Sequence, residues 1–157
     1  MELLYIWIEE YKNIKEQGFN FSSKHHFEFI PEKDKEGKIV GGELCHEGNT
    51  NHIENFFGEN ITNVTAIIGE NGAGKSSLLE FVFLNQADRK GKKGFTVFGW
   101  NDQFILYNPN EYTINTNFNI SNQIQFTRTH FIYYANYLNN FPIDNRGSID
   151  IVTPNEL

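Results

Sequence analysis

Residues 64–83 read Val-Thr-Ala-Ile-Ile-Gly-Glu-Asn-Gly-Ala-Gly-Lys-Ser-Ser-Leu-Leu-Glu-Phe-Val-Phe. Within this stretch, residues 69–76 form a complete G-x-x-x-x-G-K-[ST] motif, which is the pattern of a phosphate-binding loop. The apolar run at 64–68 predicts a buried strand, and the run after the motif predicts a helix. Glycines let backbone N–H groups converge on phosphate oxygens, and a following helix points the positive end of its dipole at the same place. The sequence therefore predicts a strand, a phosphate-binding loop and a helix in that order.

The residue types in the loop predict a task for each position. Backbone N–H groups from Asn71 to Ser76 are expected to surround the β-phosphate, and Lys75 is expected to reach the β- and γ-oxygens as a point charge and to be the catalytic residue. The Ser76 hydroxyl is expected to bind Mg²⁺. A side chain on any of the three glycines would block a positive φ or push the backbone away from the phosphate. The predicted binding residues are Gly69, Asn71, Gly72, Ala73, Gly74, Lys75, Ser76 and Ser77, the last near the α-phosphate.

Length and composition predict one packed domain. The chain has 157 residues, of which 39% are hydrophobic, and this is enough to bury a core. A formal net charge of −7 opposes nonspecific binding of nucleic acid through overall charge. Cys45 is the only cysteine, which suits a reducing compartment. Because the opening residues carry acidic Glu2 and only a short apolar run, we expect neither export nor a membrane span, and a cytoplasmic location.

Several apolar or alternating runs predict strands. The run at 3–8 suits a strand buried on both faces, and the alternating segments at 19–22 and 27–29 suit neighbouring strands of a meander. The charged stretch 31–42 predicts the tip of a hairpin, and the segment 95–107 predicts a hairpin that turns at Asn101 and Asp102. Further strand candidates are 112–114, 124–126 and 131–134. Residues 78–84 are apolar on nearly every side of the predicted helix, which predicts that it is buried between layers and ends at the basic cluster 89–93.

Two segments together carry a resemblance to a known family. The loop Gly-Glu-Asn-Gly-Ala-Gly-Lys-Ser-Ser at 69–77 resembles the Walker A motif of ABC-type ATPases, especially the SMC-like and RecF-like branch of AAA-family P-loop proteins. The strand-like run 4–8 and the following Tyr11-Lys12-Asn13-Ile14 are similar to the first strand of that family and its aromatic-basic-Asn turn. The resemblance covers roughly residues 1–90. It implies an α/β P-loop NTPase fold, a head half with a mixed sheet in which residues 64–68 form a central parallel strand beside an antiparallel β meander.

The resemblance also implies ligands and further site residues. ATP and Mg²⁺ would be the cofactors, and Lys12 matches a basic position that lies near the nucleotide in some relatives. In this family a later strand ends in a glutamine that contacts Mg²⁺. Asn136 stands in that place after the strand candidate 131–134, and Gln123 and Gln125 are rival positions.

Two elements of a complete ATPase head are missing from the sequence. No apolar run ends in Asp-Glu, and no Leu-Ser-Gly-Gly signature is present. The chain therefore resembles one partial head domain over residues 1–157, the N-terminal lobe, which is expected to bind ATP with little turnover alone. Its partners would be the remainder of the same ATPase and a second head in a homodimer, with DNA or an effector nuclease as further candidates. Such heads act in DNA processing, repair, chromosome maintenance or defence against phage.

Other readings remain open from the sequence. A small phosphoryl-transfer kinase and a nucleotide sensor that does not hydrolyse ATP are the alternative functions. Residues 144–147 match the D-x-x-G pattern of GTPases but suit an ordinary turn better. His25-His26 and Cys45-His46 lack the paired spacing of metal ligands, so ordinary strand and loop positions are favoured. The cluster 89–93 could contact DNA and the aromatic residues of 95–107 could stack on bases, but a helix end and a core explain them more simply.

Overall fold

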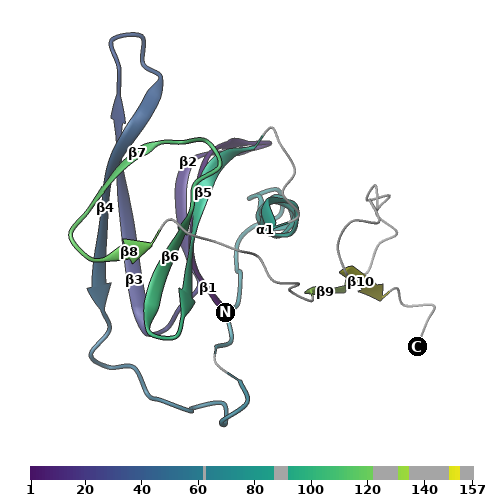
Figure 1. Ribbon diagram of the computed structural model, residues 1–157. Coiled ribbons are helices and arrows are strands. Elements are labelled where there is room, and N and C mark those ends of the chain that lie inside the picture. The colour runs from purple at the N-terminus through teal and green to yellow at the C-terminus, as the bar shows by residue number, and fades with distance from the viewer. Residues whose placement is uncertain (62, 87–91, 122–130, 135–148, 153–157) are drawn as a thin grey trace.

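The computed structural model describes residues 1–61, 63–86, 92–121, 131–134 and 149–152. Figure 1 shows two packed sheets with a single helix against the outer face of one of them. The elements are β1 (Glu2–Tyr11), β2 (Ile14–Asn20), β3 (His25–Lys33), β4 (Ile39–Gly48), α1 (Lys75–Gln86), β5 (Lys93–Trp100), β6 (Gln103–Tyr107), β7 (Thr113–Thr116), β8 (Ile120–Ser121), β9 (Phe131–Tyr134) and β10 (Ile149–Val152).

The two larger sheets are both mixed. The five-stranded sheet has the order β2-β1-β5-β6-β8, and the three-stranded sheet has the order β3-β4-β7. Neighbours in both are antiparallel except β8, which runs parallel to β6, and β7, which runs parallel to β4. Strands β9 and β10 form a separate parallel pair. The resulting order of layers is three-stranded sheet, five-stranded sheet and helix (Figure 1).

Strand β1 belongs to both hydrophobic clusters. Tyr5 and Trp7 lie in the cluster between the two sheets, whereas Ile6 and Ile8 lie in the cluster under α1. Each of these four side chains is at most 2% exposed. The Trp7 ring stacks on Phe95 at 5.7 Å between ring centroids and meets Phe29 edge-on at 4.8 Å. The sequence prediction that residues 3–8 form a strand buried on both faces is confirmed for residues 4–8.

Helix α1 buries one face against β1. Leu78 and Phe81 are 3% and 0% exposed and pack with Ile6, Ile8 and Ile14. Leu79, on another face, is 42% exposed. The predicted burial on nearly every side is therefore wrong, because only the five-stranded sheet covers the helix among the described residues.

The predicted α/β P-loop NTPase fold is wrong. The chain is 50% strand and 7% helix, and α1 is the one helix of the described residues. A P-loop NTPase places several helices around a parallel sheet. Here the aromatic residues of β1, β3 and β5 pack into a core between two sheets instead, and β1 takes the central position that residues 64–68 were predicted to hold.

The segment 64–68 is not a strand. It joins neither sheet, and Val64 and Ile68 are 57% and 91% exposed. The apolar run predicted burial, but hydrophobicity makes a strand only where a neighbouring strand and a covering layer are available. Within the described residues β1 already pairs on both edges, with β2 and with β5, so it offers no free edge to this segment.

Both predicted hairpins are confirmed. Strands β5 and β6 turn at Asn101 and Asp102, whose φ angles of 48° and 59° are those of a tight hairpin turn. The charged hairpin is β3–β4, with a tip of residues 34–38 that is shorter than predicted and projects beyond the sheets (Figure 1). The segment after it in the prediction, 112–114, is partly β7, which pairs with β4 rather than with β6. The aromatic segments of β2 and β3 lie in different sheets, so they are not neighbours in one meander.

Substituting Gly94 with alanine is expected to destabilise the fold by about 1–3 kcal/mol, the usual range for overpacking a core. A Cβ at this position would overlap the carbonyl oxygen of Trp7 and lie 3.0 Å from the Phe81 ring. The carbonyl belongs to a paired strand and cannot move away cheaply. Gly48→Ala is the matched control, since a Cβ there meets nothing within 4 Å. Urea unfolding of both variants tests this, and equal midpoints would contradict it.

Candidate functional site

The predicted phosphate-binding loop connects the segment 64–68 to α1. Gly72 and Gly74 have φ angles of 84° and 98°, which favour glycine over any L side chain. The first helical hydrogen bond runs from the Leu78 N–H to the Gly74 carbonyl at 2.8 Å. The N–H groups of residues 75–77 therefore precede the helical ladder and have no acceptor within it. Three such donors at a helix N-terminus, beside two left-handed glycines, form an arrangement suited to an anion.

Lys75 is held by its own loop. Its ammonium donates to the carbonyl oxygens of Gly69 and Glu70 at 2.6 and 2.7 Å. The Ala73 N–H also donates to Glu70, at 3.2 Å, so the loop closes on itself. Gly69 itself has no positive φ, and a Cβ there would make only ordinary contacts. A phosphate at this loop would compete with the two carbonyls for the Lys75 ammonium.

The turn between β1 and β2 contacts the loop from outside. The Asn13 side-chain amide donates to the Gly72 carbonyl at 2.9 Å, and its oxygen accepts from the Ser77 hydroxyl at 3.0 Å. A Cβ on Gly74 would lie 3.1 Å from the Asn13 amide and 3.3 Å from Ile14. Asn13 was missed as a site residue. Its only sequence signal was its place in the Tyr11-Lys12-Asn13-Ile14 turn, where the resemblance directed attention to Lys12.

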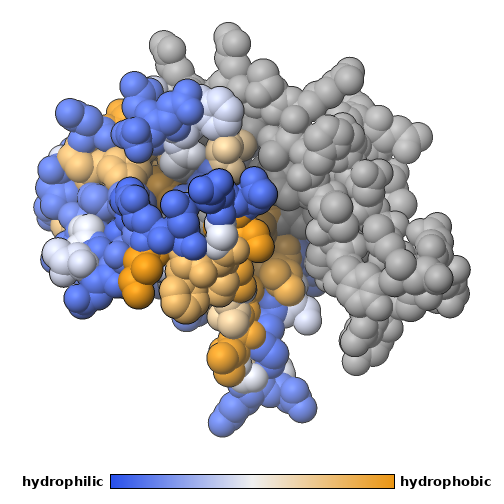
Figure 2. All heavy atoms as spheres, turned by 90° about the horizontal axis from the view of Figure 1, so that it is seen from below, coloured by the Kyte–Doolittle hydropathy of each residue, from blue (hydrophilic) through white to orange (hydrophobic). Residues whose placement is uncertain are grey.

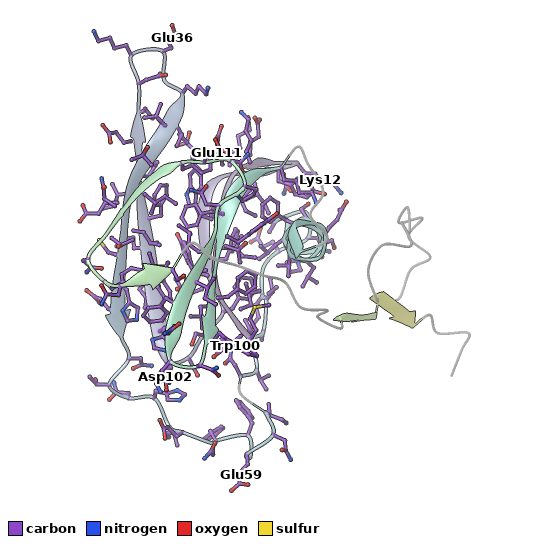
Figure 3. All side chains as sticks on the ribbon, in the orientation of Figure 1. Lys12, Glu36, Glu59, Trp100, Asp102 and Glu111 are labelled. Carbon is purple, nitrogen blue, oxygen red and sulfur yellow. The ribbon has the colours of Figure 1, made fainter. Side chains whose placement is uncertain are left out.

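Lys12 is paired with the helix rather than with the loop. Its ammonium forms an ion pair with Glu80 on α1 (Figure 3), and the Tyr11 hydroxyl donates to the same carboxylate. Partial burial alone would raise the pKa of Glu80, but the hydrogen bonds from Lys12 and Tyr11 outweigh it and lower that pKa. Burial, followed by the bond to Glu80, raises the pKa of Tyr11. For Lys12 to contact a nucleotide, it would have to leave Glu80.

The predicted metal residues are only partly described. Ser76 is exposed at the first turn of α1, and its hydroxyl makes no hydrogen bond with the described part of the chain. Asn136, its rivals Gln123 and Gln125, and the D-x-x-G pattern at 144–147 lie outside the described residues. No cluster of three or more histidine, cysteine, aspartate or glutamate side chains suited to a metal ion occurs in the described ranges.

The two other sequence alternatives that fall in part on described residues follow the simpler reading. In the aromatic hairpin, Phe95, Val97, Phe98 and Leu106 are all at most 5% exposed, so they form core rather than a base-stacking surface. Of the basic cluster, Lys92 and Lys93 are described. Lys93 belongs to β5, not to a helix end, and pairs with Glu9 at 2.9 Å. Among the helices described, none is long and apolar enough to cross a bilayer.

The structure brings together two histidines that the sequence analysis placed in separate pairs. His25 Nδ1 and His46 Nε2 lie 3.0 Å apart, a hydrogen-bond distance, and both rings contact Phe27 and Phe104. Burial lowers the pKa of both, and the neighbouring imidazole lowers that of His25 further. The pair is thus a neutral part of an aromatic cluster at neutral pH.

This pair predicts that the fold loses stability as the pH falls below about 6.5, the ordinary histidine pKa. A folded-state pKa below the unfolded one means that the unfolded chain binds more protons, so stability is fully present above that pH and is lost on acidification. The carboxylates with lowered pKa values, Glu9 and Glu80, lose theirs only below about 4.5. Denaturant midpoints at pH 5.5 and 7.5 test this. In His25→Phe/His46→Phe the difference should shrink, and an unchanged difference would contradict the assignment.

A hollow of about 1040 Å³ lies at the other end of β1 from the loop. Its lining includes Glu2, Lys24, His52, Trp100 and Asp102, and it includes no residue of 69–77. Charges of both signs alternate around it, and Lys24 pairs with Glu54 across it at 3.4 Å. Exposed apolar side chains flank it on the loop 49–63, and Figure 2 shows apolar residues gathered on this lower face. The members of this exposed set are Ile53, Phe56, Phe57 and Ile61.

Comparison with known proteins gave no match to this chain, whether to a protein-family model, to a curated protein or to a solved structure.

Proposed function

We propose that the chain binds Mg²⁺-ATP through residues 69–77, as the nucleotide-binding part of an ATPase of the SMC and ABC type that its sequence resembles. The observation that carries the proposal is the junction of loop and helix. Two glycines with positive φ, Lys75, and three N–H groups ahead of the helical ladder lie within one short segment. This combination presents donors and positive charge, and no side chain fills the space in front of them at Gly72.

The charges at the loop favour a metal complex over the free nucleotide. Lys75 supplies one positive charge and the helix dipole about half a charge more. Lys12 is neutralised by Glu80, and Glu70 adds a negative charge to the loop itself. A triphosphate carries about four negative charges, so a divalent cation is needed to balance it. Ser76, exposed at the start of α1, is the residue that would hold Mg²⁺.

Binding without turnover is the expected activity of the chain alone. Hydrolysis needs an oriented water and stabilisation of the transition state in addition to a phosphate grip. The sequence contains no apolar run that ends in Asp-Glu. We infer that the catalytic carboxylates come from another part of the ATPase or from a partner. ATP is favoured over GTP by the resemblance alone.

Calorimetric titration of the chain with Mg²⁺-ATP tests the proposal. Binding is expected with Mg²⁺ and is expected to weaken at least tenfold when EDTA removes the metal, because the charge at the loop is then unbalanced. A phosphate-release assay in parallel should show no turnover. Release that depends on an added acceptor would favour the kinase alternative instead. No binding at 1 mM nucleotide, a dissociation constant that corresponds to about −4.1 kcal/mol, would overturn the proposal.

A further inference from the structure

We propose that Asn13 positions the phosphate-binding loop and thereby sets its affinity for phosphate. The inference rests on the proposed function. One side-chain amide bonds to both ends of the loop, to the Gly72 carbonyl before Lys75 and to the Ser77 hydroxyl after it. A carbonyl can only accept, so the NH₂ group of Asn13 faces Gly72 and its oxygen must face Ser77. The orientation of the amide is therefore fixed by chemistry.

The bond to Gly72 orients a neighbouring N–H group. In a trans peptide the C=O and the following N–H point in opposite directions. No cis peptide occurs among the described residues, so a Gly72 carbonyl turned toward Asn13 turns the Ala73 N–H away from it and into the loop. There the N–H meets the Glu70 carbonyl at 3.2 Å, on the side where Lys75 also donates. Without Asn13 this peptide would be free to rotate and to present an oxygen to the phosphate.

The bond to Ser77 sets the hydroxyl proton. As long as Ser77 donates to Asn13, its hydroxyl offers only lone pairs to a phosphate oxygen. Binding at that position would need the proton to turn from Asn13 to the ligand. Asn13 thus holds one donor of the loop in reserve while it holds a second peptide in place.

The loop needs this support because the chain before it is not held by a sheet. Residues 64–68 pair with no described strand, and Ile68 is 91% exposed. The turn that carries Asn13 is rigid in contrast. Ile14 is 3% exposed against Leu78 and Phe81, and the Tyr11 ring meets Phe81 edge-on at 5.4 Å. Asn13 therefore transfers the rigidity of the β1–β2 turn to the loop.

Titration of variants with Mg²⁺-ATP and with Mg²⁺-pyrophosphate tests the inference. Asn13→Ala should weaken both ligands about tenfold, because it removes two hydrogen bonds that order the loop. Asn13→Asp should weaken both further, about a hundredfold, because it keeps the acceptor for Ser77 but loses the donor to Gly72 and adds a negative charge. The two ligands should lose equally, since Asn13 acts on the phosphates and not on the base.

The matched control is Asn20→Ala. The Asn20 side chain also makes two hydrogen bonds, both to the backbone of Phe27, but at the other end of β2. This variant should lower the thermal midpoint and leave the affinity of the folded chain unchanged. Asn13→Ala should do the reverse. Wild-type affinity in Asn13→Ala, or a loss explained by unfolding alone, would overturn the inference. No binding by the wild-type chain would overturn the proposed function, and with it this inference.

Discussion

Lys75→Ala abolishes measurable binding of Mg²⁺-ATP in the outcome we expect, and it leaves the fold intact. The substitution removes the loop's own unpaired positive charge, which would form charge-assisted hydrogen bonds worth about 1.5–3 kcal/mol each. Two such bonds amount to a loss of at least roughly a hundredfold in affinity. In the structure Lys75 bonds only to two exposed loop carbonyls, so stability should change by no more than about 0.5 kcal/mol.

Calorimetry and circular dichroism on the same preparation measure the two effects of this substitution. Lys35→Ala is its control, because Lys35 is exposed at the β3–β4 tip and the change removes the same charge far from the loop. That variant should bind as the wild type does. If Lys75→Ala retained the wild-type affinity, the loop would not be the binding site.

Trp7→Ala is expected to cost about 3–5 kcal/mol of folding free energy, the usual range for truncating a buried large aromatic residue. Trp7 is 1% exposed, and its ring contacts Phe29, Phe95 and Tyr112 between the two sheets. A small domain has about 5–15 kcal/mol in total, so most of the folded population is at risk. The cavity also removes support from β1, which carries the turn that contacts the loop.

Guanidinium unfolding followed by far-UV circular dichroism measures this loss. The chain has two tryptophans, and the other supplies the control, because Trp100 is 49% exposed at the end of β5. Trp100→Ala should shift the free energy of unfolding by less than about 1 kcal/mol. Equal midpoints for the two variants would show that the aromatic cluster does not hold the sheets together.

Local patterns predicted the strands and turns well. The apolar run at the start predicted a doubly buried strand, and Asn101-Asp102 between alternating segments predicted a tight turn, because both signals depend on near neighbours in sequence. The pairing of those strands was not predictable in the same way. The segment 113–116 pairs with β4, about seventy residues earlier, and no feature of its four residues specifies that partner.

The motif located the loop but misled the prediction of its surroundings. Gly72 and Gly74 adopt the positive φ angles that the motif requires, and α1 begins at Lys75 as expected. The fold class was inferred from family resemblance, and it failed because the surrounding aromatic residues pack two sheets face to face. Asn13 was missed for a related reason. It lies 59 residues before Gly72, and a contact over that separation becomes visible only when the turn is placed against the loop.

Strand β1 links the cooperativity of the whole molecule to the loop. Because its two edges pair with β2 and β5 and its two faces enter both hydrophobic clusters, neither the helix nor the opposite sheet can detach without breaking it. Its amide protons should therefore exchange with solvent only when the entire chain unfolds. A ligand that slows exchange in this strand would report a gain in global stability rather than a local tightening.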